Sequence, residues 1–133
     1  MVYPKSCQFL IEILTSTNDR YAIQQPEVHL HPKAQAAFGE LIYTNAKSNR
    51  NKFYIETHSD FTINRFRYCL AKDNVAEGQH KDKPSAQVVF FERKGTNTSF
   101  TTIPISPNGK YDQNMPEAYG RFFIDEELKV LDI

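Results

Sequence analysis

Two short polar segments of this sequence carry side chains suited to catalysis or ligand binding. Each segment directly follows an apolar run, and the candidate residues are Gln24, Gln25, Glu27, His58 and Ser59. A carboxylate can accept a proton, whereas an amide offers a neutral oxygen acceptor and cannot take one. A histidine that ends a buried strand and precedes a helix can donate to a phosphate oxygen without carrying a full charge. These five positions are therefore the candidate functional residues.

A metal site is a second interpretation of the same region. His29 and His31 alternate around Leu30, and Glu27 and His58 would complete a ligand set of the kind that zinc takes. This interpretation predicts a small metal-dependent hydrolase, while a third places both histidines on a solvated loop. No Cys or Ser has a matched base and orienting acid nearby, so the sequence does not support nucleophilic catalysis.

The elements that must position these residues alternate along the first half of the chain. Apolar spacing predicts a helix over 7–15, and short apolar runs predict strands at 21–23 and 53–55. Pro32 suits the first turn of a second helix that ends in the polar residues 45–51. Its core-facing residues are predicted to be Ala34, Ala37, Phe38, Leu41 and Ile42.

A third helix should begin at Ser59 or Asp60, either of which is a suitable N-cap. Its apolar stripe is predicted to contain Phe61, Ile63, Phe66 and Leu70. The order helix, strand, helix, strand, helix predicts an α/β fold with parallel strands joined by crossovers, which gathers polar residues at the carboxyl ends of the strands.

The pattern changes after residue 72. Residues 72–85 are polar without periodicity and predict an exposed connection. The β-rich runs 86–92 and 99–105 predict an antiparallel hairpin, and Pro107-Asn108-Gly109 predicts a turn. A short amphipathic piece at 125–131, preceded by Tyr119, Phe122 and Phe123, could fold back on the sheet.

Composition limits the function classes. The 133 residues are 40% hydrophobic, which is enough for one packed core. Sixteen basic residues balance sixteen acidic residues, so no overall field attracts nucleic acid or an anionic membrane. No apolar run approaches the ~20 residues that span a bilayer, and no signal sequence follows the start, so we expect a cytoplasmic chain without membrane contact. Cys7 and Cys69 have no metal-site spacing and are expected to be packing residues.

The two polar segments also carry a resemblance. Gln24-Gln25-Pro26-Glu27-Val28-His29-Leu30-His31-Pro32 is similar to the Walker B strand end and D-loop of ABC-type P-loop ATPases, and Glu56-Thr57-His58-Ser59 to their switch-histidine loop. Both segments also resemble those of the group around the overcoming-lysogenization-defect proteins. Residues 86–131 resemble, less specifically, the small domain of unknown function that ends many such ATPases. The resemblance implies a partial ABC-type P-loop fold: a parallel sheet with flanking helices, then a small antiparallel hairpin subdomain.

The resemblance implies a role for each residue in phosphoryl transfer. Gln24 matches the acid that holds Mg²⁺ through water, and Gln25 the residue that orients or deprotonates the attacking water. An amide offers Mg²⁺ no negative charge and cannot act as a base, so both roles are weakened unless Glu27 or Glu56 substitutes. His58, with Ser59 beside it, matches the contact to the γ-phosphate.

The phosphate-binding loop is absent from the sequence. No Gly-x-x-x-x-Gly-Lys-Ser/Thr occurs, and the five glycines are scattered. The resemblance therefore divides the chain into a C-terminal part of an ATPase core (1–72), a linker (73–85) and a small β-rich subdomain (86–133). We expect it to be inactive alone and to bind ATP and Mg²⁺ only in a composite site, whose P-loop half comes from another chain. A homo-oligomer is the alternative partner arrangement.

The alternative is a non-catalytic interaction module derived from an ATPase. The resemblance also implies a prokaryotic setting in DNA maintenance or phage defence. Any link to nucleic acid is expected to be indirect, because the basic residues Arg65, Arg67, Arg93 and Lys94 are few and suit a solvated surface.

Overall fold

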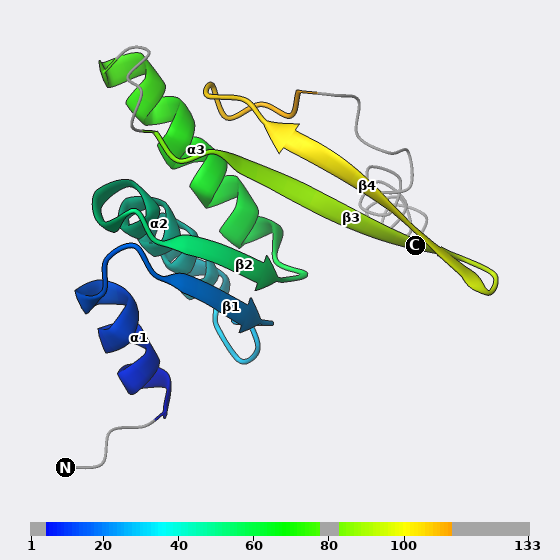
Figure 1. Ribbon diagram of the computed structural model, residues 1–133, viewed down its shortest axis with the longest axis horizontal. Helices are drawn as coiled ribbons and strands as arrows, with labels where there is room; N and C mark the ends of the chain where they lie inside the picture. The colour runs from blue at the N-terminus through cyan, green and yellow to red at the C-terminus, as the bar shows by residue number, and fades with distance from the viewer. Residues whose placement is uncertain (1–4, 78–82, 113–133) are drawn as a thin grey trace, which may run out of the picture. The chain divides into compact units, whose positions relative to one another are not determined.

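The computed structural model describes residues 5–77 and 83–112 of the chain (Figure 1). The chain divides into two compact units, one up to Pro84 and the other from Ser85 onward. In the first unit, two parallel strands are flanked by helices, and in the second two long strands form an antiparallel hairpin. The predicted α/β class with a following hairpin is therefore confirmed.

The strands of the first unit are β1 (Arg20–Gln24) and β2 (Lys52–Glu56). They pair in parallel, in a register that runs from Arg20 opposite Lys52 to Gln24 opposite Glu56. Exposure alternates along both strands, so one face of the pair is partly covered and the other is open among the described residues. Tyr21 of the covered face stacks on Phe53, with 5.4 Å between ring centroids.

Three helices accompany this strand pair: α1 (Lys5–Thr15), α2 (Pro32–Asn49) and α3 (Asp60–Glu77). His31 caps α2, its Nδ1 accepting a hydrogen bond from the Lys33 N–H at 3.3 Å, and Pro32 occupies the first turn as predicted. Ser59 caps α3, because its Oγ accepts from the Thr62 N–H at 3.2 Å. The predicted starts of α2 and α3 are confirmed, whereas α1 begins two residues before the predicted residue 7.

The predicted buried face of α2 is only partly correct. Ile42 is buried, but Ala34 and Ala37 are exposed, whereas Gly39 and Tyr43 are buried instead. The physical reason is that α2 packs closely against α3 as well as against β2. Gly39 lies at a close approach of the two helices, since a Cβ there would stand 2.2 Å from the carbonyl oxygen of Thr62 on α3.

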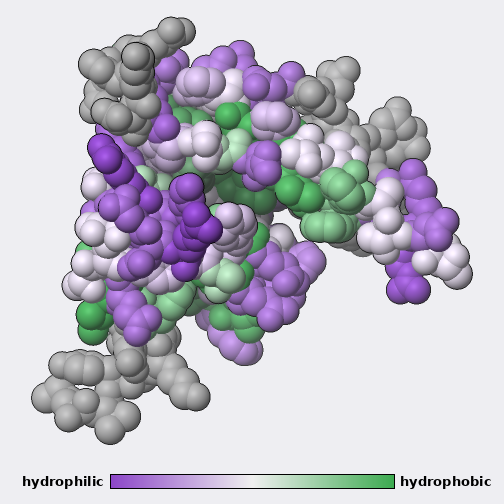
Figure 2. Space-filling model, viewed as in Figure 1, coloured by the Kyte–Doolittle hydropathy of each residue, from purple (hydrophilic) through white to green (hydrophobic). Residues whose placement is uncertain are grey.

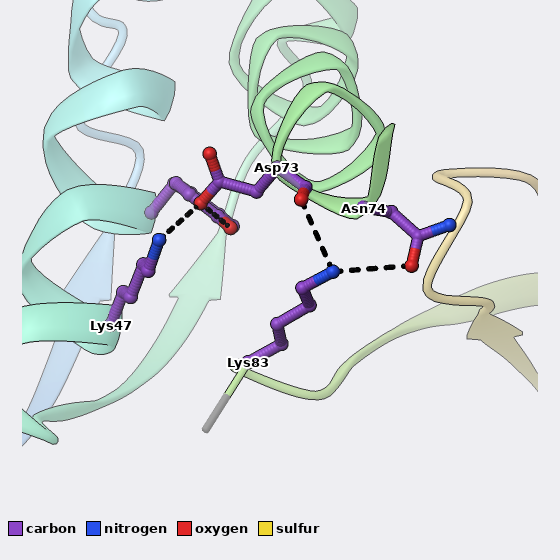
Figure 3. Close-up of polar contacts among 5 residues, drawn as sticks. Lys47, Asp73, Asn74 and Lys83 are labelled. Atoms are coloured by element: carbon purple, nitrogen blue, oxygen red, sulfur yellow. Dashed lines mark hydrogen bonds and ion pairs between the residues drawn. The ribbon is translucent and has the colours of Figure 1, made fainter. Parts of the chain in front are cut away.

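The predicted connection 72–85 is wrong at its start, because α3 continues to Glu77. Polar side chains hold this extension in place. The Asp73 carboxylate of α3 accepts hydrogen bonds from Lys47 at 2.7 Å and from the Tyr43 hydroxyl at 2.6 Å, both on α2. Figure 3 shows Lys47 pointing to Asp73, and Lys83 reaching the Asp73 carbonyl and the Asn74 side chain. These polar contacts therefore hold α3 against α2. The stripe predicted for α3 is also uneven, since Leu70 is buried and Phe61 is exposed.

A buried amide pair joins α1, α2 and the entry to β2. Asn45 donates to the Ile13 carbonyl at 2.7 Å, and Asn51 donates to the Asn45 side chain at 2.7 Å. The Asn51 Oδ1 accepts from the Asp19 N–H at 2.8 Å, which fixes the start of β1. The predicted end of this helix within 45–51 is confirmed, since α2 runs to Asn49 and Arg50 terminates it in a left-handed conformation.

The second unit is a hairpin of β3 (Ala86–Lys94) and β4 (Asn97–Ile105). Gly95 (φ 64°) and Thr96 make the two-residue turn, for which a positive φ is needed. The predicted turn at 107–109 is confirmed by hydrogen bonding across it, from the Ser106 N–H to the Lys110 carbonyl at 2.8 Å. Figure 2 shows polar colouring at the hairpin tip and apolar colouring along its middle. The predicted piece at 125–131 and its aromatic residues lie outside the described residues.

None of the helices in residues 5–77 and 83–112 has the length and apolar character needed to cross a membrane.

Candidate functional site

The two candidate segments leave neighbouring strands at the same edge of the sheet. The Gln25 N–H donates to the Glu56 carbonyl at 2.8 Å, which extends the β1–β2 ladder by one residue. Residues 25–31 then form the first loop and residues 57–59 form the second. We call them the Gln25 loop and the His58 loop. Because both loops start from paired strand ends, the chain brings them together as the parallel pairing predicts.

The loops are joined directly by Glu27. Its Oε1 accepts a hydrogen bond from the His58 backbone N–H at 2.6 Å. Its Oε2 is shielded from solvent and has no hydrogen-bond partner within the described part of the chain. Partial burial raises the pKa of Glu27, but hydrogen bonds from the His58 and Glu27 backbone and from the Thr57 side chain, with the nearby His58 imidazole, outweigh it and hold the pKa below its ordinary value. Glu27 is therefore a carboxylate at neutral pH.

The Gln25 loop contains two residues in the left-handed region of the backbone map. Gln25 has φ 44° and His29 has φ 67°. Residues other than glycine and asparagine rarely adopt this backbone conformation, which costs them ~1–3 kcal/mol. The Val28 N–H to Gln25 carbonyl bond at 3.2 Å and the Leu30 N–H to Glu27 carbonyl bond at 2.9 Å hold the turns in place. The loop is thus tightly folded rather than extended.

Behind the loops lies a polar network that sequence reasoning missed. Ser59 donates through Oγ to the Gln35 Oε1 at 2.6 Å, and the Gln35 Nε2 donates to the Leu30 carbonyl at 2.9 Å. Ser59 is 4% exposed and Thr62 is 5% exposed. A helical glutamine near a first turn carries no distinctive sequence signal, since glutamine is mostly a surface residue. Only the packing of α2 beside α3 reveals its role.

The predicted site residues differ in their surroundings. Gln24 and His58 are exposed, and Gln25 and Glu27 are half-buried. Gln24 stands opposite Glu56, which is also exposed, in the strand register. The neutral Gln24 amide offers a divalent cation an oxygen but no charge, which fits weak Mg²⁺ contact through water at most.

The zinc interpretation is wrong for this arrangement. Within residues 5–77 and 83–112, no three histidine, cysteine, aspartate or glutamate side chains gather closely enough to hold a metal ion. His31 uses its Nδ1 to cap α2, and Glu27 uses Oε1 to hold the His58 backbone. The alternating His29 and His31 are both exposed.

Residues 9–63 match the family model of an AAA ATPase domain. The matched segment holds both strands of the parallel pair and both loops, and it ends in the first turn of α3. Searches of curated proteins and of solved structures found no match. The family match relates residues 9–63 of this chain to AAA ATPase domains.

Proposed function

We propose that this chain supplies the Walker B-like strand end, the D-loop-like turn and the switch-histidine-like loop of a composite ATP site. The phosphate-binding loop would come from another protein chain, because this sequence contains none. Homo-oligomerisation is the alternative partner arrangement, but it would cover the sheet without supplying that loop. One observation carries the proposal: the Gln25 and His58 loops leave paired parallel strands and are bound together by Glu27, with the Glu27 Oε1 2.6 Å from the His58 N–H. The match of this segment to AAA ATPase domains supports it.

The side chains present favour slow hydrolysis even in a completed site. The Gln24 amide gives Mg²⁺ no anionic ligand, and the Gln25 amide cannot remove a proton from water. Glu27 and Glu56 are the candidate substitute bases, but the lowered pKa of the Glu27 carboxylate makes Glu27 a weaker one. A missing general base costs ~10²–10⁴ in rate. The chemistry therefore favours nucleotide binding and sensing over rapid turnover, with His58 as the phosphate contact and Ser59 beside it.

The test is calorimetric titration of ATP·Mg²⁺ into the purified chain, alone and mixed with any protein that co-purifies with it. The isolated chain should give no binding heat, and the mixture should bind. In the mixture, His58→Ala should weaken ATP·Mg²⁺ binding by about tenfold or more, as expected for a lost hydrogen bond to charged phosphate. Gln87→Ala on the hairpin is the matched control and should leave binding unchanged. Tight ATP binding by the isolated chain would contradict the proposal.

A second candidate is a non-catalytic interaction module. The observation that favours it is the cross-strand pair of Phe91 and Phe100 on the hairpin, which are 66% and 69% exposed. Aromatic side chains of this kind are enriched where proteins meet. Partner binding that is unaffected by ATP and by His58→Ala, but lost with Phe91→Ser, would favour this candidate. The DNA-maintenance or phage-defence setting rests on the resemblance alone.

A further inference from the structure

We propose that Gln35 is a positioning residue, which fixes the His58 loop against the Gln25 loop by bonding to both. The proposal rests on the composite ATP site for its functional meaning, but its structural content can be tested without nucleotide. Gln35 lies in the first turns of α2, directly after the Gln25 loop, and its side chain is half-buried. Its side chain acts through Leu30 and Ser59.

The Gln35 amide uses both of its functions at once. Its Nε2 donates to the Leu30 carbonyl in the Gln25 loop at 2.9 Å, and its Oε1 accepts from the Ser59 Oγ in the His58 loop at 2.6 Å. Among neutral side chains, a primary amide is the group that offers a donor and an acceptor side by side. Glutamate keeps the acceptor but loses the donor, and leucine loses both. The position therefore requires the amide chemically, not only a side chain of that size.

The surroundings give Ser59 few alternatives. Its Oγ already accepts from the Thr62 N–H at 3.2 Å, and the Thr62 hydroxyl lies 3.2 Å away. The Ser59 hydroxyl proton is thus directed to Gln35. Because Ser59 is buried, an unmatched hydroxyl there would be unfavourable, and the loop would have to shift to reach water.

The consequence concerns His58, which stands between two attachment points. Its own N–H is bound to Glu27, and the next residue, Ser59, is bound to Gln35. Both attachments lead back to the Gln25 loop, so a movement of that loop is transmitted to the backbone that carries the imidazole. In the completed site, this linkage would set the position from which His58 meets the terminal phosphate.

Amide hydrogen exchange, followed by NMR in the full chain, tests the linkage. Gln35→Leu should raise the exchange rates of the His58 and Leu30 amides by about tenfold or more, because both loops are released. Gln35→Glu, which is nearly identical in shape, should release Leu30 and leave Ser59 held, so the Leu30 amide should change more than that of His58. Exchange in the buried middle of α3, around Leu70, should stay constant. Gln87→Leu on the hairpin is the control.

Unchanged exchange of the His58 amide in Gln35→Leu would overturn the proposal. So would equal changes at Leu30, His58 and Leu70, because these indicate general destabilisation of the fold. If Gln35→Leu does not fold, the isosteric Gln35→Glu provides the test. In that variant the exchange rate of the Leu30 amide should rise more than that of the His58 amide, and equal changes would overturn the proposal. No ATP is present in the measurement, so failure here leaves the composite site untouched, and failure of ATP binding leaves the linkage standing.

Discussion

Glu27 is the candidate residue whose side chain joins the two loops directly. One carboxylate oxygen binds the backbone of the other loop, and the second is shielded without a partner in the described structure. A group held in this way is suited to fixing geometry. It is less suited to removing protons, because the interactions that stabilise its charge also weaken it as a base. The neutral Gln24 and Gln25 offer oxygen acceptors, so the carboxylate charge of the Gln25 loop comes from Glu27.

The lowered pKa of Glu27 makes stability depend on pH. Its folded-state pKa lies below that of the unfolded chain, ~4.3, so its contribution is complete above the unfolded value and is lost as pH falls through the folded one. Glu27→Gln keeps an oxygen acceptor but removes this titration. We expect the variant to lose ~1 kcal/mol of unfolding free energy at pH 7, and the difference from the natural protein to shrink towards pH 3.

Urea unfolding between pH 3 and pH 7 measures this difference. The pKa of Asp73 is lowered by hydrogen bonds from Lys47 and Tyr43, so Asp73 also makes the unfolding free energy depend on pH. This dependence is the same in both proteins and cancels in the comparison. Glu56→Gln, at the exposed end of the neighbouring strand, controls for simple loss of a charge. If the difference in unfolding free energy between Glu27→Gln and the natural protein stays constant from pH 3 to pH 7, the titration of Glu27 does not contribute to stability.

The contact of α2 with α3 depends on Gly39, which has no side chain. A Cβ at Gly39 would stand 2.2 Å from the Thr62 carbonyl oxygen and 3.2 Å from the Arg65 Cβ. Backbone atoms of α3 cannot yield as a flexible side chain can, so Gly39→Ala must push the helices apart. We expect a loss of ~2–3 kcal/mol in unfolding free energy, despite the higher helix propensity of alanine.

Thermal unfolding of Gly39→Ala compared with Ser48→Ala provides the measurement. Ser48 lies on the exposed side of the same helix, where alanine should leave stability unchanged or raise it by a few tenths of a kcal/mol. A Gly39→Ala protein as stable as the natural one would show that the helices do not approach as closely as described.

The buried amides Asn45 and Asn51 hold α1 and both strand entries in place. Each is at most 4% exposed, and Asn51 bonds to Asn45, to Ser16 and to the Asp19 N–H. Asn51→Ala would leave buried partners unsatisfied, and we expect it to cost ~2–3 kcal/mol. In a double-mutant cycle with Asn45→Ala, the two losses should overlap by ~1 kcal/mol or more, because both break the same bond. Additive losses would argue against the shared bond.

These elements also show what the sequence could reveal. The short apolar runs before Pro26 and His58 predicted both parallel strands, because strand ends are marked by local chemistry. Asn45 and Asn51 were interpreted as turn-forming residues, since an asparagine side chain is buried only where the tertiary fold supplies its partners. Gln35 was missed for the same reason. The loops could be found from residue type and order, whereas the network that holds them depends on how α2 meets α3.

Considered as a whole, the first unit contains a sheet that its described residues do not cover fully. Ala22 and Tyr54 stand opposite each other on the open face of β1 and β2, and Tyr54 is 64% exposed. Parallel sheets are normally covered on both faces, and a two-stranded sheet also leaves strand edges unpaired. An incomplete sheet of this kind fits a unit that is completed by further protein, as the composite site requires.

This open face should govern the association of the purified chain. We expect concentration-dependent self-association in sedimentation velocity experiments, and Tyr54→Arg should weaken it by about tenfold, because a charge would be buried against the second copy. Phe91→Arg tests the hairpin, whose aromatic pair is equally exposed. If Phe91→Arg disperses the assembly and Tyr54→Arg does not, the hairpin is the interface. The sheet face would then play no part in self-association. That result would argue for the interaction module and against the composite site.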